Sequence, residues 1–222
     1  MKLNSSRKAI LFDLDGTLLH TAPDFAHCLN QMLSKLEQPL VSVQSMKPWV
    51  SDGVRGMVKG AFNIDESDLS FTSKTAELLA LYAKHLGDFT EFFPGMLEVL
   101  AWLDTQKIIW GVVTNKSFRF AAPLLAKFNL LKRAHCLVCG DTLATQKPDP
   151  APIQYACQQL KLETKDCFYI GDSFSDAKAS SGAGMPYILA EYGYIPPTAD
   201  LKSWPIFKSI TKPLDVLSLF SC

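Results

Sequence analysis

Residues 10–17 read Ile-Leu-Phe-Asp-Leu-Asp-Gly-Thr, an apolar run that ends in two carboxylates two positions apart. Such a run predicts a strand of a parallel sheet, because helices cover both faces of these strands. Asp13 and Asp15 then lie at the carboxyl edge of the sheet, where open α/β folds bind ligands. Gly16 permits a tight turn whose backbone N–H groups can face an anion. The stretch therefore predicts an α/β fold with a polar site directly after its first strand.

Apolar segments rich in β-branched residues alternate with segments of helical period along the rest of the chain, which favours βα repeats. Stripes of apolar residues near 96–103 and 152–160 predict helices that cover the sheet. The expected fold is a Rossmann-like parallel sheet flanked by helices. Its strands are expected at 9–12, 108–113, 136–138, 167–170, 187–189 and near 206–210.

About a hundred residues separate the first two expected strands, far more than one crossover helix needs. The segment from Thr21 to Asp24 is typical of a helix start, with Thr21 as the N-cap and Asp24 reaching back to it. A second helical pattern runs from about residue 65 to residue 86. We therefore expect an all-helical insert at 20–88 within an α/β core formed by 1–19 and 89–222.

The 222 residues contain 22 basic and 22 acidic side chains, so the formal net charge is zero. No global positive field attracts nucleic acid or an anionic membrane surface, and neither partner is expected. No apolar stretch approaches the ~20 residues that span a bilayer or resembles a signal-peptide core, so we expect a cytoplasmic protein. We also expect a monomer or a weak homodimer, with the cysteines remaining free thiols.

Polar side chains also follow the later strands. Thr114 and Asn115 come after the strand at 108–113, and a hydroxyl and an amide there can donate to a phosphate oxygen. Lys147 precedes Pro148, which restrains its backbone, so Lys147 can bring a fixed cation to the same edge. Each feature alone also fits a helix cap or a surface lysine. Their convergence favours a phosphate-binding site.

A further strand ends in Asp172 and Ser173, and Asp176 follows shortly after. Asp13, Asp15 and Asp172 would form a cluster of oxygen ligands with no histidine or thiolate close by in the sequence. Hard oxygen ligands favour Mg²⁺ over zinc or copper. The sequence therefore predicts a magnesium site at the sheet edge.

These motifs resemble those of the haloacid dehalogenase superfamily, and within it the phosphatases similar to phosphoglycolate phosphatase. The resemblance covers essentially the whole chain and implies a phosphomonoesterase with an inserted, mobile helical cap. It implies that Asp13 is the nucleophile that forms an aspartyl-phosphate, and that Asp15 is the general acid and base. It implies Mg²⁺ held by Asp13, Asp172 and the backbone carbonyl of Asp15. The implied phosphate ligands are Thr114, Asn115 and Lys147, supported by Ser173 and Asp176.

Two other functions use a reactive aspartate at a strand end. A dehalogenase of the same fold attacks carbon and needs no acid for an alkoxide leaving group, so Asp15 argues against it. A receiver-type signalling domain is near ~120 residues and lacks both the second aspartate of the first motif and the helical insert. The sequence therefore favours a phosphatase that acts on a small phosphate ester.

The specificity of this phosphatase is expected to depend on two segments. Residues 49–55 form a glycine-containing turn in the insert, which is either a helix–helix connection or a substrate-facing loop. Its candidates for substrate contact are Ser51, Gly53 and Arg55. The aromatic segment 192–196 is either a packed loop or a pocket rim that contains Tyr192.

The segments 21–25, 110–116, 119–121 and 192–195 resemble the branch of bacterial enzymes that dephosphorylate N-acetylmuramic acid 6-phosphate in cell-wall recycling. We therefore expect this substrate, with phosphoglycolate as the alternative. Both candidates contain a carboxylate, and Arg55 is expected to bind it because a guanidinium can grip a carboxylate with two hydrogen bonds.

Overall fold

The computed structural model describes residues 8–50 and 52–220. The chain forms two compact units. The first, the core unit, contains residues 1–19, 92–193 and 200–222, and the second, the helical unit, contains 20–91 and 194–199. Within the described ranges, none of the helices combines the length and the apolar character that a membrane crossing requires.

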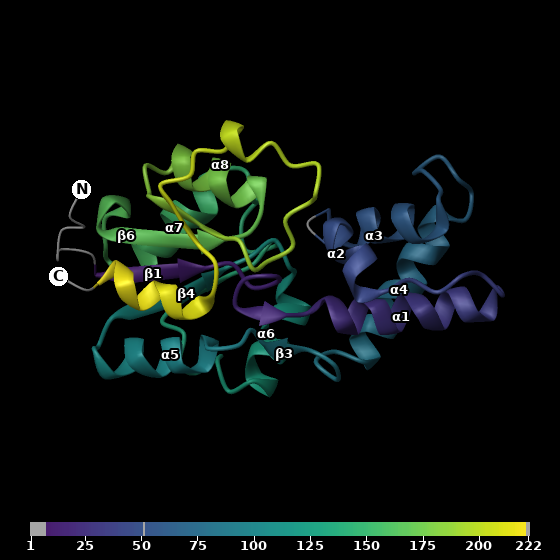
Figure 1. Ribbon diagram of the computed structural model, residues 1–222, viewed down its shortest axis with the longest axis horizontal. Coiled ribbons are helices and arrows are strands. Elements are labelled where there is room, and N and C mark those ends of the chain that lie inside the picture. The colour runs from purple at the N-terminus through teal and green to yellow at the C-terminus, as the bar shows by residue number, and fades with distance from the viewer. Residues whose placement is uncertain (1–7, 51, 221–222) are drawn as a thin grey trace. The chain divides into compact units, whose positions relative to one another are not determined.

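A six-stranded parallel sheet forms the centre of the core unit, with strand order β5-β4-β1-β6-β7-β8 (Figure 1). The sheet confirms the Rossmann-like fold class, and each expected strand is present within a few residues of its predicted bounds. The strands are β1 Ala9–Phe12, β4 Ile109–Val113, β5 Leu137–Val138, β6 Cys167–Gly171, β7 Tyr187–Ala190 and β8 Lys208–Ile210.

The register of the central strands decides what meets at the sheet edge. Phe12 of β1 pairs with Val112 of β4 on one side and with Ile170 of β6 on the other. Strand β1 ends at this level, and β4 and β6 end one residue later. The residues that follow the three strands therefore lie side by side. The first, second and fourth motifs thus meet at one edge.

Helices cover both faces of the sheet. Helix α5, Met96–Thr105, lies on one side, and helices α7, Ala151–Leu160, and α8, Phe174–Gly182, lie on the other (Figure 1). The predicted stripe in α5 is buried, which confirms that this helix packs on the core. The remaining elements are α6 Phe118–Lys127 and the short 3₁₀ segments η1 Thr164–Asp166, η2 Leu201–Ser203 and η3 Pro213–Leu219.

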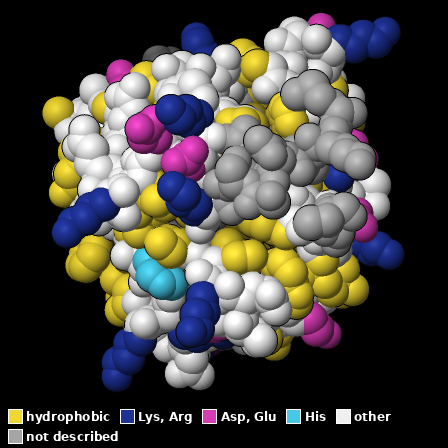
Figure 2. All heavy atoms as spheres, turned by 90° about the vertical axis from the view of Figure 1, so that its left-hand side faces the viewer, with side chains coloured by type: hydrophobic (Ala, Val, Ile, Leu, Met, Phe, Trp, Pro, Cys, Tyr) yellow, Lys and Arg dark blue, Asp and Glu magenta, His cyan; other side chains and the backbone are white. Residues whose placement is uncertain are grey.

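The face at the amino ends of the strands differs from the motif-bearing edge. Figure 2 shows this face, with lysine, arginine and acidic side chains scattered among apolar ones rather than gathered by sign. Among the described residues of this face, positive charge is not concentrated in one patch.

Four helices build the helical unit: α1 Ala22–Lys35, α2 Val43–Val50, α3 Gly53–Phe62 and α4 Phe71–Lys84. The chain passes between the units through β2 Leu19–His20 and β3 Glu91–Phe92, which pair with each other. The helix predicted from residue 65 begins only at Phe71. The carboxylates of Asp65 and Asp68 accept hydrogen bonds from the backbone N–H groups of Ser67 and Ser70, at 2.8 and 2.7 Å, and these bonds favour turns over helix.

Asp24 does not cap helix α1 as the sequence predicted. Thr21 makes no side-chain capping bond, and the fully buried carboxylate of Asp24 accepts hydrogen bonds from the end of the insert instead. The donors are the N–H groups of Gly87 and Phe89, at 2.6 and 2.7 Å, and the hydroxyl of Thr90 at 2.7 Å. A buried carboxylate needs several fixed donors, and these long-range partners supply them.

Residues 194–199 belong to the helical unit, whereas the sequence analysis assigned them to the core. The reason is Tyr194, which is buried in the helical unit. Its hydroxyl accepts a hydrogen bond from the N–H of Ala22 at 2.9 Å and lies 2.7 Å from Nδ1 of His20. The aromatic segment is therefore divided, with Tyr192 and Gly193 in the core unit.

Candidate active site

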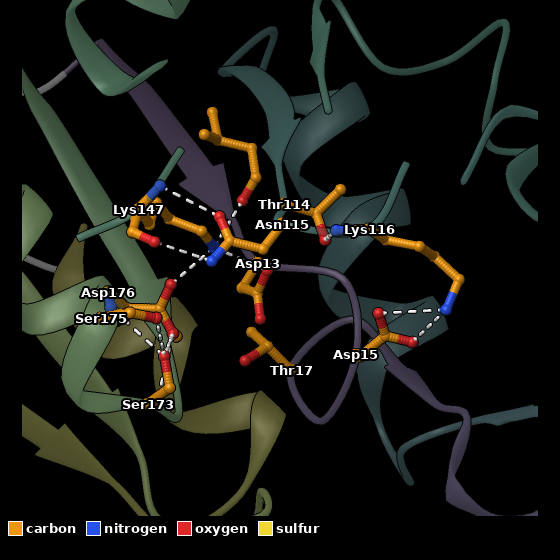
Figure 3. Close-up of polar contacts among 12 residues, drawn as sticks. Asp13, Asp15, Thr17, Thr114, Asn115, Lys116, Lys147, Ser173, Ser175 and Asp176 are labelled. Atoms are coloured by element: carbon orange, nitrogen blue, oxygen red, sulfur yellow. Dashed lines mark hydrogen bonds and ion pairs between the residues drawn. The ribbon is translucent and has the colours of Figure 1, made fainter. Parts of the chain in front are cut away.

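The motif residues converge at the carboxyl edge of the core sheet (Figure 3). Asp13 follows β1, Thr114 follows β4 and Asp172 follows β6. All three are buried, although each carries a polar side chain. Buried polar groups need specific partners, so the contacts among these side chains define what the edge can do.

Lys147 lies at the centre of the site and is itself buried. Its ammonium Nζ is 2.8 Å from Oδ1 of Asp13 and 2.6 Å from Oδ1 of Asp176. It also donates to the hydroxyl of Tyr169 at 2.7 Å and to the carbonyl of Val113 at 3.0 Å. Burial acts to lower the pKa of Lys147, but the two carboxylates outweigh burial and raise it, so the lysine is a permanent cation.

The pKa of Asp13 is raised as well, which for a carboxylate disfavours the charged form. Burial, with the neighbouring carboxylate of Asp176, raises the pKa of Asp13 above its ordinary value, although Lys147 acts against this rise. A carboxylate that is buried beside other carboxylates is under electrostatic stress, which a further cation relieves. The site therefore favours binding of an additional positive charge near Asp13.

The carboxylate oxygens of Asp13, Asp172 and Asp176 lie within 4.8 Å of one another. The group contains the carboxylate of Asp176 in addition to those of Asp13 and Asp172, and the contribution expected of Asp15 through its backbone carbonyl stays a prediction. The hydroxyl of Thr17 donates to Oδ1 of Asp172 at 3.4 Å, a long hydrogen bond. Three oxygen donors at this spacing form a possible site for a hard divalent cation.

Helix α8 fixes Asp176 through its own N-terminus. Ser173 is the N-cap: its hydroxyl accepts from the N–H of Asp176 at 3.2 Å, and Asp176 Oδ2 accepts from the N–H of Ser173 at 3.0 Å. A Cβ atom on Gly171 would lie 2.5 Å from the Asp176 carboxylate, so only glycine permits this approach. The supporting roles predicted for Ser173 and Asp176 thus have a geometric basis, the capping box.

Asn115 contacts the backbone of Lys147. Its side-chain amide donates to the carbonyl of Lys147 at 2.8 Å, and its Oδ1 accepts from the N–H of Lys147 at 3.0 Å. The oxygen of the amide and one of its two N–H donors thus hold the backbone of Lys147, and the phosphate contact expected of Asn115 stays a prediction. The hydroxyl of Thr114 accepts from the N–H of Lys116 at 3.1 Å and retains its own proton for a ligand oxygen.

Asp15 lies apart from the three clustered carboxylates. Its Oδ1 and Oδ2 atoms are 2.9 and 3.2 Å from Nζ of Lys116 (Figure 3). The side chain of Asp15 is 18% exposed, whereas that of Lys116 is 6% exposed. Asp15 is therefore held by the ammonium of Lys116 and is still partly open to solvent.

The predicted rim residues lie in three places. Gly53 and Arg55 are in α3 of the helical unit, where the guanidinium forms an ion pair with Glu66 and lies 5.6 Å from the ring of Phe71. Ser51 lies outside the described residues. Residues 49–55 therefore contain a helix–helix connection between α2 and α3, as one of the two interpretations held.

Tyr192 packs against the first motif of the core unit. Its hydroxyl donates to the carbonyl of Thr17 at 3.2 Å, and its ring centroid lies 4.9 Å from that of Phe93. A Cβ atom on Gly193 would lie 2.3 Å from Cβ of Asp172 and 2.6 Å from the carbonyl oxygen of Gly16, so glycine is required there. The segment thus supports the loops that carry Asp15 and Asp172.

Comparison with known proteins assigns the family. The sequence profile of the haloacid dehalogenase-like hydrolases matches residues 10–190, which is most of the chain. The chain belongs to the haloacid dehalogenase-like hydrolase family. It is 35% identical over 209 residues to an N-acetylmuramic acid 6-phosphate phosphatase of Pseudomonas putida, covering 94% of each chain.

Other haloacid dehalogenase-like hydrolases are similar over much of the chain. A phosphoglycolate phosphatase of Nitrosococcus oceani is 36% identical over 190 residues, covering 83% of this chain and 84% of its own. The crystal structure of a predicted phosphoglycolate phosphatase from Haemophilus somnus matches with a TM-score of 0.84 and 27% identity, covering 97% of this chain and 99% of that one. These relatives identify the chain as a phosphatase of the family.

Three contributors to this haloacid dehalogenase-like site were not predicted as site residues. Lys116 adjoins Thr114 and Asn115 in the sequence, but nothing local shows that it reaches Asp15. Tyr169 lies in an apolar strand, three positions before Asp172. The hydroxyl of Tyr169 donates to the carbonyl of Val113 at 2.7 Å, across the intervening strand β1. Burial raises the pKa of Tyr169 well above its ordinary value, so the hydroxyl keeps its proton. Gly193 lies in the aromatic segment 192–196, and nothing in that pattern indicates its close approach to Asp172.

Proposed function

We propose that the protein is a Mg²⁺-dependent phosphomonoesterase that transfers the phosphoryl group of a small phosphorylated acid or sugar acid to Asp13. The observation that carries this proposal is the setting of the Asp13 carboxylate. It lies at the end of the central strand, 2.8 Å from a buried lysine and within 4.8 Å of the carboxylate oxygens of Asp172 and Asp176. This arrangement surrounds one nucleophilic oxygen donor with groups that bind phosphate or its metal.

The clustered carboxylates fit Mg²⁺. The donors of Asp13, Asp172 and Asp176 are all oxygen, and the three carboxylates surround the single ammonium of Lys147, which contacts Asp13 and Asp176. Negative charge therefore exceeds positive charge in the cluster, as a divalent cation requires. Mg²⁺ would be held by Asp13, Asp172 and the backbone carbonyl of Asp15, and when bound it neutralises charge on the transferring phosphoryl group.

The side chains of the site account for two successive transfers. A carboxylate oxygen of Asp13 forms a bond to phosphorus while the bond from phosphorus to the alcohol oxygen breaks, and Asp15 gives that oxygen a proton. Asp15 then takes a proton from a water molecule that attacks the phosphorus of the aspartyl-phosphate. Inorganic phosphate leaves and Asp13 is regenerated. Lys147 and Thr114 hold the non-reacting phosphate oxygens during both steps.

For the substrate we favour N-acetylmuramic acid 6-phosphate. The supporting observation is that relatives of that name from Pseudomonas putida and Pseudomonas aeruginosa match 94% and 97% of this chain at 35% and 36% identity. A phosphoglycolate phosphatase of Xanthomonas campestris matches 93% of this chain at 35% identity, so the activity assay decides between the two substrates. The helical unit would act as a cap that selects the substrate, with Arg55 binding its carboxylate in exchange for Glu66. Phosphoglycolate is the second candidate because it carries the same two anionic groups on a smaller frame.

A phosphate-release assay tests the proposal in two stages. The purified protein is first assayed on p-nitrophenyl phosphate with Mg²⁺ and after chelation, with Asp13→Asn as the inactive control. Metal-dependent turnover that Asp13→Asn abolishes is expected, and metal-independent or Asp13-independent turnover would overturn the mechanism. The kcat/KM values for the two acids are then compared. A preference of tenfold or more for phosphoglycolate, about 1.4 kcal/mol in the transition state, would overturn the substrate assignment.

A further inference from the structure

Two lysines divide the acidic side chains of the site between them. Lys147 contacts Asp13 and Asp176, at 2.8 and 2.6 Å. Lys116 contacts Asp15: its ammonium Nζ lies 2.9 and 3.2 Å from the two carboxylate oxygens of Asp15. The nucleophile and the acid–base carboxylate thus have separate cations, and only the first of these cations was expected from the sequence.

The backbone of Lys116 is fixed on both sides. Its N–H donates to the hydroxyl of Thr114 at 3.1 Å, and its carbonyl accepts from the N–H of Gly140 at 3.0 Å. The aliphatic part of the side chain is enclosed, since the whole side chain is only 6% exposed. A lysine that starts from a fixed backbone and runs through a buried path delivers its ammonium to one position, unlike a typical surface lysine.

We propose that Lys116 is the positioning residue for Asp15, which sets the direction of the carboxylate that exchanges a proton with the substrate. The proposal rests on the function proposed above. A carboxyl group rotates readily about its terminal bond, and contact with both oxygens fixes that rotation. The Asp15 carboxylate is not part of the oxygen group formed by Asp13, Asp172 and Asp176. The acid–base group therefore remains outside the metal-binding cluster.

This role has a signature that depends on the leaving group. An alkyl phosphate loses an alkoxide, which needs a proton from a well-placed acid as the bond breaks. An aryl phosphate such as p-nitrophenyl phosphate loses a stabilised phenolate, which needs this proton far less. Because kcat/KM covers the steps up to departure of the alcohol, the ratio of kcat/KM between the two esters reports the placement of the acid.

The test compares Lys116→Met, which keeps the length and loses the cation, with Lys116→Arg, which keeps the cation. The substrates are p-nitrophenyl phosphate and whichever alkyl ester, N-acetylmuramic acid 6-phosphate or phosphoglycolate, the wild type hydrolyses faster. Exposed Lys132→Met is the matched control for a lost lysine on the same unit. Thermal unfolding of each variant shows that folding is retained.

We expect Lys116→Met to lose about 10- to 100-fold in kcat/KM on the alkyl ester, and less than fivefold on the aryl ester. Lys116→Arg should recover most of the loss, and Lys132→Met should show none. In the background of Asp15→Asn, adding Lys116→Met should cause little further loss, because the two residues act through one proton transfer.

Other outcomes overturn the proposal. Equal losses on both esters with a raised KM would make Lys116 a phosphate ligand, and equal losses with a large fall in unfolding temperature would make it structural. Full additivity with Asp15→Asn would show that the pair has no functional link. If the wild type is active and any of these results appears, the positioning role alone fails. A wild type that hydrolyses no phosphate ester overturns the proposed function and this role together.

Discussion

The core unit and the helical unit each bury carboxylates, but they satisfy them differently. In the helical unit, Asp24 accepts three hydrogen bonds of 2.6 to 2.7 Å, two of them from rigid backbone N–H groups. In the core unit, Asp13 and Asp176 share one lysine ammonium, and Asp172 receives a hydroxyl at 3.4 Å. Asp24 is held by neutral donors, whereas the core group places three carboxylates around one ammonium, with Asp176 also accepting from the N–H of Ser173 at 3.0 Å.

The difference separates a structural role from a chemical one. A carboxylate that is saturated by backbone donors cannot take a new ligand without breaking the fold around it. Carboxylates that crowd around one buried ammonium carry excess negative charge, which a metal ion can offset. Substitutions in the core group should therefore affect turnover, and substitution of Asp24 should affect folding.

Asp13→Asn should give the largest effect on turnover. Loss of the nucleophile should lower kcat by at least about 10³-fold, or about 4 kcal/mol of transition-state stabilisation. The free energy of unfolding should fall by less than about 1 kcal/mol or should rise, because a stressed buried charge is removed. Steady-state kinetics and urea unfolding measure the two quantities. A variant with a tenth of wild-type activity would contradict covalent catalysis at Asp13.

Removal of the metal should come next. Exhaustive chelation should reduce phosphate release to background, and Mg²⁺ should restore it, because the clustered carboxylates need a divalent cation to hold a phosphate. Ca²⁺ should bind without supporting turnover, since it prefers more ligands and looser geometry. Asp172→Asn should raise the Mg²⁺ concentration needed for half-maximal activity. Unchanged activity after chelation would show that the core carboxylates hold no metal needed for turnover, and it would remove the contrast with Asp24.

Asp24→Ala should act on folding. It leaves three donors without their acceptor, and we expect a loss of about 3 kcal/mol in the free energy of unfolding. Glu77→Gln is the matched control in the same unit, because Glu77 forms an exposed ion pair with Lys35 at 3.0 Å. That pair should contribute less than about 1 kcal/mol. Comparable effects of the two substitutions in urea unfolding would show that Asp24 is not a structural anchor.

Tyr169→Phe should have a moderate effect on turnover. It removes the hydroxyl that lies 2.7 Å from Nζ of Lys147, so the ammonium gains freedom and kcat/KM should fall about tenfold, or about 1.4 kcal/mol. Tyr187→Phe, which loses a hydroxyl bonded to the carbonyl of Gly171 at 2.9 Å, is the control for loss of a buried tyrosine hydroxyl. It should leave kcat/KM within about threefold of wild type.

Arg55→Ala should give the smallest effect, restricted to acidic substrates. Use of either phosphorylated acid should fall about fivefold in kcat/KM, or about 1 kcal/mol, while p-nitrophenyl phosphate is hydrolysed at the wild-type rate. Lys59→Ala is the control, because Lys59 also contacts Glu66, at 2.8 Å. Equal losses on acidic and aryl substrates would show that Arg55 is structural.

The strands and the principal acids were predictable because each depends on local signals. An apolar run followed by a carboxylate identifies Asp13 and Asp172 without knowledge of any partner strand. That these acids lie at one edge then follows from the rule that ligands bind at the carboxyl ends of the strands. The same reasoning recovered Lys147 only because Pro148 marks its backbone as restrained.

The remaining contacts could not be predicted because they depend on distant parts of the chain. Asp24 has the pattern of a helix cap, yet its donors lie more than sixty residues away. The hydroxyl of Tyr169 reaches its partners because β6 pairs with β1 in a register that places Tyr169 beside Leu11. The contact between Lys116 and Asp15 likewise requires that β4 and β1 be neighbours. Local patterns carry no information about such registers.

The central position of β1 has a consequence for how the chain folds. Ala9 pairs with Ile109 and with Cys167, so this strand contacts segments about 100 and 160 residues later in the sequence. During synthesis the apolar residues 9–12 therefore emerge long before either neighbour exists, whereas the helices of the insert can form from local contacts. Asp13 reaches its final surroundings only after both long-range pairings close. Folding intermediates should accordingly expose this strand, and they should be the forms of the protein most prone to aggregate.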